Sequence, residues 1–149
     1  MNSPMLKNIL AAIVGYVVMF AAVFITFSIM WLILGPGGSF EPGSWAVSTA
    51  WVGASIVLGL LAGIAGGFVC SKLAASHQGV AILIGLVLVL GIASAIPDAP
   101  VTVGPRPDDI SMFDAMLTAN QPRWLAWLTP VLGVVGTILG SRLQAKKAA

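Results

Sequence analysis

The feature that most constrains the fold is a set of four long apolar runs without a single Asp, Glu, Lys, Arg or His. They cover residues 8–34, 45–70, 80–96 and 124–141. About 20 apolar residues suffice to cross a bilayer as a helix. Only 8% of the 149 residues are charged, against roughly 25% in soluble domains. We therefore predict an all-α integral membrane protein, a four-helix transmembrane bundle that forms one domain over residues 1–149.

Gly and Pro mark the predicted connections between the runs. Gly35-Pro36-Gly37-Gly38 is expected to end the first helix, and Pro97 the third. Residues 97–123 form the one long loop, and its second half predicts a short amphipathic helix at about 109–119, with Asp108 or Asp109 as its cap. The apolar residues of that helix fall at helical spacing: Ile110, Phe113, Met116 and Leu117. This helix either rests on the membrane interface or provides a docking surface or lid.

The cations predict how the bundle is oriented. Five lie on one side of the predicted membrane and two on the other: Lys7, Lys72, Arg142, Lys146 and Lys147 against Arg106 and Arg123. The excess of Lys and Arg faces the cytoplasm in membrane proteins. We therefore expect a multi-pass protein of the cytoplasmic (inner) membrane with both termini in the cytoplasm and the 97–123 loop outside.

Small residues recur at every fourth position in the second run. They are Ser55, Gly59, Gly63, Gly67 and Ser71. This spacing puts them on one face of a helix, where small side chains let another helix approach closely. The partner is either a helix of the same chain, with Gly133, Gly136 and Gly140 of the fourth run as the natural complement, or a second subunit.

A weak internal match at an offset of 70 residues predicts a tandem duplication of a two-helix hairpin. Gly63, Gly66, Ser71 and Lys72 align with Gly133, Gly136, Ser141 and Arg142. Biased composition produces such matches easily. A true duplication would relate the two hairpins by an axis along the membrane normal.

All five tryptophans fall toward the predicted outer ends of the helices: Trp31, Trp45, Trp51, Trp124 and Trp127. Tryptophan favours membrane interfaces, and the usual belt occupies both of them. This one-sided outer rim is interpreted as an anchor in the outer leaflet, or as a surface for a partner subunit or a lipid-derived ligand.

Hydroxyl side chains are the main polar groups inside the helices, and most lie in the outer half. Each can bond to a carbonyl of its own helix or to a neighbouring helix. Together they are also able to line a polar cavity that opens outward. The members are Thr26, Ser28, Ser48, Thr49, Ser55, Ser94, Thr129 and Thr137.

Reactive constellations are missing from the spanning runs. Ionisable groups within the membrane usually mark ion pathways or proton relays, so proton-coupled transport and intramembrane acid catalysis are disfavoured. His77 and Cys70 are the only His and Cys, and two ligands do not make a metal site. We expect no metal, no cofactor and no nucleic acid as partner.

These observations favour a small non-catalytic membrane protein. Its expected partners are the lipid bilayer and other membrane subunits or itself, so it would act as an accessory subunit of a larger complex or as a homo-oligomer. The alternative is a small transporter or channel for a neutral or lipid-like solute. A third, weaker hypothesis is an enzyme whose site lies in the loop acids Asp98, Asp108, Asp109 and Asp114.

Overall fold

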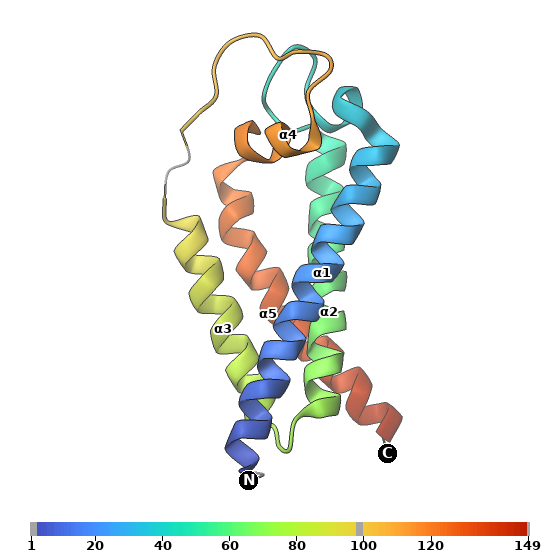
Figure 1. The fold of residues 1–149 in the computed structure, drawn as a ribbon, viewed down its shortest axis with the longest axis vertical. Helices are drawn as coiled ribbons and strands as arrows, with labels where there is room; N and C mark the ends of the chain where they lie inside the picture. The colour runs from blue at the N-terminus through green and yellow to red at the C-terminus, as the bar shows by residue number, and fades with distance from the viewer. Residues whose placement is uncertain (1–2, 98–99, 149) are drawn as a thin grey trace.

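The computed structural model describes residues 3–97 and 100–148, and that part of the chain is helical without a strand. Four of its five helices are long and apolar enough to cross a membrane. The long helices run side by side, and the short one lies across one end of them (Figure 1). The helices are α1 (Pro4–Ser39), α2 (Thr49–Leu73), α3 (Gln78–Ala95), α4 (Met112–Thr118) and α5 (Arg123–Ala148).

The two ends of the bundle differ. At one end, called the loop end below, α4 and the connection between α1 and α2 cover the helices (Figure 1). The α2–α3 turn, the start of α1 and the end of α5 lie at the opposite end, called the turn end below (Figure 1). Helix α2 packs most extensively against α5 and then against α1, while α3 packs against α5 and α1. Helices α1 and α5 share little contact with each other.

Helix α1 continues beyond the predicted end at residue 34. Gly35 adopts φ 60° and ψ −177°, which bends the chain, and one more turn follows as far as Ser39. Only glycine adopts this conformation at little cost. Pro36 then suits the new turn, because its fixed φ is already helical and its missing N–H lies where the first turn needs no donor. The Gly-Pro pair therefore produces a kink where the sequence predicted a stop.

Helix α2 begins at Thr49, four residues after the predicted start. Ser48 is the N-cap: its Oγ accepts a hydrogen bond from the Trp51 N–H at 3.1 Å and donates one to the Gly38 carbonyl at 2.6 Å. A serine in this position satisfies a free donor of the first helical turn. Trp45 consequently lies in the connection, which is tied to the last turn of α1.

A buried asparagine, Asn8, organises the turn between α2 and α3. Its Oδ1 accepts hydrogen bonds from the N–H groups of Ala75 and Ser76 at 2.9 and 3.1 Å. Its Nδ2 donates to Ser76 Oγ at 2.9 Å and to Gln78 Oε1 at 3.4 Å. One side chain of α1 thus provides hydrogen-bond partners for the turn between α2 and α3. These bonds fix the register of α1 against both helices.

The remaining helix bounds lie near the predicted ones except at the end of the chain. Helix α3 covers residues 78–95, close to the predicted 80–96, but α5 runs to Ala148 where the sequence predicted an end at 141. The extra turns contain Lys146 and Lys147. Lysine is a good helix former, and cations are favourable in the last turn of a helix.

The closest packing in the bundle joins α2 to α5 through glycines. A Cβ placed on Gly63 would lie 3.0 Å from the Gly133 carbonyl oxygen and 3.0 Å from the Gly136 Cα, and one on Gly67 would lie 2.6 Å from the Thr137 Cα. Gly140 approaches the Ile64 carbonyl in the same way. These neighbours are backbone atoms, so the two helices meet at a distance that any side chain would prevent.

The loop end of the small-residue face differs from the rest of that face. Ser71 Oγ donates a hydrogen bond to Gln144 Oε1 of α5 at 3.4 Å. A Cβ on Gly59 would meet only the Leu132 side chain, at 3.9 Å, and Ser55 bonds to the Trp51 carbonyl of its own helix. The centre and the turn end of this face are thus covered by α5, whereas Ser55 and Gly59 border a cavity.

Candidate functional site: a cavity under α4

A cavity of about 390 Å³ lies at the loop end, between α1, α2 and α5 and beneath α4. Volumes of roughly 300–1,000 Å³ are typical of small-molecule sites. Six of the lining residues follow one stripe of α1: Phe20, Val23, Phe24, Phe27, Ser28 and Trp31. This stripe is about 16 Å long at the helical rise of 1.5 Å per residue. The cavity is therefore elongated along the helix.

Aromatic rings form much of the cavity wall. Trp51 lies 5.5 Å from Phe27 and 6.3 Å from Trp31 between ring centroids, and Trp31 lies 6.3 Å from Phe40. All three pairs are edge-to-face, an arrangement that stabilises aromatic contacts beyond their buried area. The wall is therefore apolar and held by ring contacts that join α1 to α2.

Helix α4 forms the roof of the cavity. Ala115 is buried against Phe40 and Val47, while Met112 and Met116 line the space below. Ser111 caps the helix, because its Oγ accepts from the Asp114 N–H at 3.1 Å and donates to Asp114 Oδ2 at 2.6 Å. This cap explains why α4 begins at Met112, later than the predicted 109. Methionine is flexible and fits irregular apolar partners.

The roof is held in place by Asn120. Its side chain exchanges two hydrogen bonds with the Thr102 backbone, both at 2.9 Å. Its own N–H donates to the Trp45 carbonyl at 2.8 Å, and its carbonyl accepts from the Val47 N–H at 3.2 Å. One residue therefore joins the chain after α4 to the α1–α2 connection and to the long loop.

Ser39 provides a polar group at the closed end of the cavity. It is only 2% exposed, it lines the cavity, and its Oγ has no hydrogen-bond partner among the described residues. The other hydroxyls of the lining, on Ser28, Ser55 and Thr129, each donate to the carbonyl four residues earlier in their own helix. A buried polar atom without a partner costs about 1–3 kcal/mol, and among the described side chains only Ser39 Oγ and Trp45 Nε1 are in this state.

The electrostatic character of the cavity is neutral. None of the described residues that line it carries an ionisable side chain. The guanidinium of Arg106 lies 5.0 Å from the centroid of the ring of Phe40, a lining residue. Its Nε donates to the Ser44 carbonyl at 3.1 Å and its Nη1 to the Pro107 carbonyl at 3.1 Å. The arrangement can hold an uncharged molecule with few hydrogen-bonding groups.

The structure divides the four apolar residues of the predicted amphipathic helix. Met116 lines the cavity, and Ile110 packs beside the buried cluster of Phe40, Val47 and Ala115. Phe113 and Leu117 are 68% and 83% exposed. One face of α4 thus covers the cavity, while Phe113 and Leu117 are open to the surroundings.

The five tryptophans all lie at the loop end but in two settings. Trp31 and Trp51 belong to the cavity wall, and the ring of Trp45 lies 6.4 Å from that of Phe40. Trp124 and Trp127, near the start of α5, are 54% and 45% exposed. Only these two therefore have the exposure expected of an interfacial anchor.

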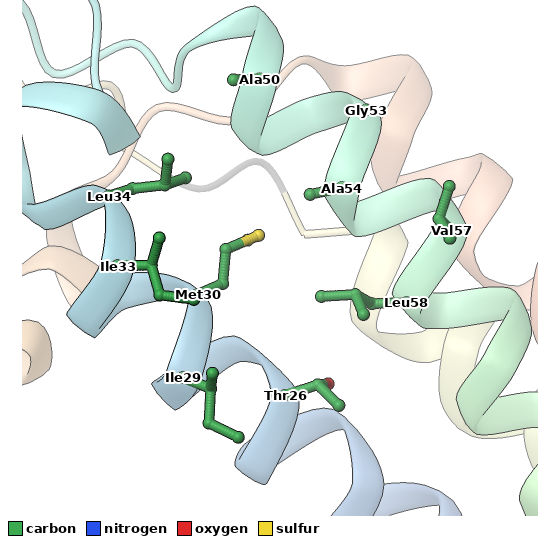
Figure 2. Close-up of a pocket in the computed structure, with 10 residues that line it drawn as sticks. All are labelled: Thr26, Ile29, Met30, Ile33, Leu34, Ala50, Gly53, Ala54, Val57 and Leu58. Carbon is green, nitrogen blue, oxygen red and sulfur yellow. The ribbon is translucent and has the colours of Figure 1, made fainter.

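A second hollow is an open groove of about 580 Å³ between α1 and α2. Figure 2 shows Met30 of α1 and Leu58 of α2 pointing toward each other across it. A Cβ on Gly53 would meet nothing within 4 Å. The one hydroxyl of the lining, on Thr26, already donates to the Ala22 carbonyl at 2.7 Å. This groove offers apolar contact only.

The other chemistry-bearing residues do not gather into a site. Asp98 lies outside the described residues, and within the described ranges no group of three or more His, Cys, Asp or Glu is placed to hold a metal ion. Cys70 is buried, with its Cβ beside Gly15 of α1, and His77 directly precedes α3. Neither residue contacts the cavity under α4.

Sequence reasoning missed the two residues that define this site, Ser39 and Asn120. Ser39 stands directly after a Gly-rich stretch, so the sequence alone predicts that it belongs to a connecting loop. The signal that predicts the position of Ser39 is the Gly-Pro pair before it. Proline is favourable at the first position of a helical turn, so one more turn can follow the pair. Asn120 follows α4 among polar residues, and its pairing with Thr102 depends on a loop path that local sequence does not encode.

Comparison of this chain with protein-family models, with curated proteins and with solved structures finds no match.

Proposed function

We propose that this protein is a non-catalytic membrane protein that binds a neutral, lipid-like molecule in the cavity under α4, as a small carrier of such a solute would. The observation that carries the proposal is the cavity of about 390 Å³ with aromatic walls and no ionisable lining residue among those described. Burying a charge there would be costly, whereas an apolar molecule gains about 25 cal/mol for each Å² removed from water.

The opening of the cavity supports a membrane-derived ligand. Its buried lining residues, such as Phe40 and Leu125, lie toward the loop end, whereas Phe20 and Phe24 of α1 are 65% and 47% exposed. These exposed rings lie on a helix that is long and apolar enough to cross a membrane. A molecule dissolved in the bilayer is able to enter sideways between α1 and α5 without crossing water.

Photolabelling with a long-chain alkane that carries a diazirine tests this function. The probe would label Phe40 and Leu125 only if it enters the cavity, because both side chains are 3% exposed. We expect adducts on these residues in detergent-solubilised protein, and competition by excess unlabelled alkane. Labelling confined to exposed positions such as Leu32 and Ile33 would refute the proposal.

A matched pair of glycine variants locates the site. Gly59→Phe directs a ring into the cavity, where a Cβ meets only Leu132 at 3.9 Å, while Gly53→Phe makes the same change on the same helix at the separate α1–α2 groove. We expect Gly59→Phe to abolish adducts on Phe40 and Leu125, and Gly53→Phe to preserve them. Equal labelling of the two variants would contradict the site.

The α1–α2 groove favours a second candidate function, that of an accessory subunit which packs against a partner helix or a second copy. Ala50, Gly53, Ala54 and Val57 give α2 a small-residue surface beside α1 that no other helix of this chain covers. Such surfaces suit close helix packing in lipid. This role predicts that Gly53→Phe releases a co-purifying partner or a second copy while Gly59→Phe retains it, as measured by size-exclusion chromatography with light scattering.

We further propose that the chain resides in the cytoplasmic membrane with both termini inside, which would put α4 on the outer side. The distribution of Lys and Arg supports this orientation. Leu117, at 83% exposure on α4, is the position for a test. A cysteine introduced at this position in intact cells should react with a membrane-impermeant maleimide, whereas the buried Cys70 should not.

A duplicated origin of the two halves is also part of the proposal. Two of the α2–α5 approaches, Gly63 to Gly133 and Gly67 to Thr137, join residues 70 positions apart. Contacts between equivalent residues are expected near an axis that relates two repeats. The two halves differ at Gly15 and Gly85, which are also 70 positions apart. A Cβ on Gly15 would lie 2.7 Å from the Cys70 Cβ, whereas a Cβ on Gly85 would meet nothing within 4 Å.

A further inference from the structure

We infer that the occupant of the cavity is a neutral single-chain amphiphile, of the class of long-chain alcohols and monoacylglycerols, whose head group hydrogen-bonds to Ser39 and whose tail lies between α1 and α5. This inference depends on the proposed binding function and adds the chemical class and the direction of the ligand.

The first observation is the isolated hydroxyl of Ser39. A serine inside a helix usually donates to the carbonyl four residues earlier, as Ser28 and Ser55 do here. For Ser39 that carbonyl belongs to Gly35, where the backbone leaves the helical conformation. The kink thus leaves Ser39 Oγ buried in the lining without an intrahelical acceptor. Rotation of the Ser39 side chain toward the cavity would let a ligand hydroxyl or carbonyl supply the missing partner.

The second observation is the shape of the cavity. Its volume of about 390 Å³ is near the lower limit of the roughly 300–1,000 Å³ of small-molecule sites. The stripe from Phe20 to Trp31 gives it about 16 Å of length along α1. A narrow, elongated space fits one alkyl chain better than two chains or a compact ring system.

The third observation is where Ser39 lies relative to the exposed rings of the cavity wall. Ser39 lies at the buried end, under α4, and the exposed rings of Phe20 and Phe24 lie toward the middle of α1. Helices of this length place their ends near the membrane interface and their middle in hydrocarbon. The head of an amphiphile would then lie at interfacial depth and its tail among lipid chains, as in the bilayer itself.

The head group is uncharged, because the described lining residues offer neither a cation to an anionic head nor a carboxylate to a cationic one. The guanidinium of Arg106 lies against the Phe40 ring and donates to the Ser44 and Pro107 carbonyls. It is not a lining residue. A carboxylate next to Ser39 would be buried without a counter-ion, which costs far more than burying a hydroxyl.

The test compares three diazirine probes of equal chain length: an alcohol, an alkane and a fatty acid. Each is titrated against wild type, Ser39→Ala and the control Ser55→Ala, and the adduct on Leu125 is measured by mass spectrometry. Ser55 also lines the cavity, but its hydroxyl is bonded to Trp51. We expect Ser39→Ala to weaken alcohol binding by about two- to tenfold, the equivalent of one hydrogen bond, and to leave the alkane unchanged. Ser55→Ala should change neither.

A measurement without ligand separates recognition from a structural role. Because Ser39 Oγ has no partner in the described structure, Ser39→Ala should leave the unfolding midpoint of the ligand-free protein unchanged or raise it. A lowered midpoint would mean that the hydroxyl stabilises the fold, and would overturn the inference.

The remaining outcomes distinguish the inference from the function on which it rests. If alcohol and alkane label Leu125 equally in wild type and in Ser39→Ala, the head-group assignment is wrong and Ser39 is satisfied by water, while the binding function stands. Tighter binding of the fatty acid than of the alcohol would refute the neutral class. Absence of Leu125 adducts with all three probes would refute the binding function itself.

Discussion

Substitution of Gly67 by alanine would test the glycine contact between α2 and α5. The new Cβ would lie 2.6 Å from the Thr137 Cα and 2.7 Å from its carbonyl carbon. Relaxed carbon contacts lie at about 3.5–4.0 Å, so the helices would have to separate locally by roughly 1 Å. Both neighbours are backbone atoms of a residue that is fully buried, and no rotamer change relieves them.

The size of the effect follows from this geometry. Overpacking of a well-packed interior costs about 1–3 kcal/mol, and separation of α5 from α2 would also weaken the neighbouring contact of Gly63 with Gly133. We expect Gly67→Ala to lower the free energy of unfolding by about 2–3 kcal/mol. In a membrane such packing is a main source of helix association, because lipid removes the hydrophobic driving force.

Gly85→Ala is the matched control, in the interior of α3. A Cβ there meets nothing within 4 Å, so the change should be neutral or stabilise by up to about 1 kcal/mol through helix propensity. Both variants are measured by titrating dodecyl sulfate into mixed micelles and following helicity by circular dichroism. Equal stability of the two variants would refute the argument that backbone proximity at Gly67 holds the bundle together.

Three further substitutions test the local devices of the fold. Asn8→Ala should lower the free energy of unfolding by about 2–3 kcal/mol, because the Ala75 and Ser76 N–H groups lose their acceptor; an unchanged unfolding midpoint would contradict this. Asn120→Ala should loosen the chain around α4, so limited proteolysis should cut near residue 102 several times faster than in wild type, with the four long helices intact. Gly35→Ala should cost about 1–2 kcal/mol, because its φ of 60° is left-handed, and a stabilised variant in the same titration would contradict the kink.

The long helices were predictable because their signal is strong and local. Apolar runs without ionisable residues identify spanning segments almost without regard to tertiary context. The four-residue spacing on α2 predicted that its small-residue face packs either against a helix of this chain, with Gly133, Gly136 and Gly140 as the complement, or against a second subunit. In the structure the centre of that face contacts α5.

The helix ends and the cavity were less accessible to sequence reasoning. Gly35-Pro36 stops a helix in most contexts, yet here one more turn follows and leaves Ser39 without an acceptor. The cavity exists because α1 and α5 share little contact while α4 lies above them. Both facts depend on how separate elements meet, which periodicity within one element does not reveal.

The most direct test of a ligand site under α4 is the amount of alcohol probe cross-linked to Leu125 in wild type and in Gly59→Phe. Leu125 is buried in the cavity wall, so its labelling reports occupancy of the cavity and not adhesion to the outer surface. We predict strong labelling in wild type, competition by unlabelled alcohol, and loss of labelling in Gly59→Phe. Labelling that is absent in wild type, or that persists undiminished in Gly59→Phe, would contradict the account.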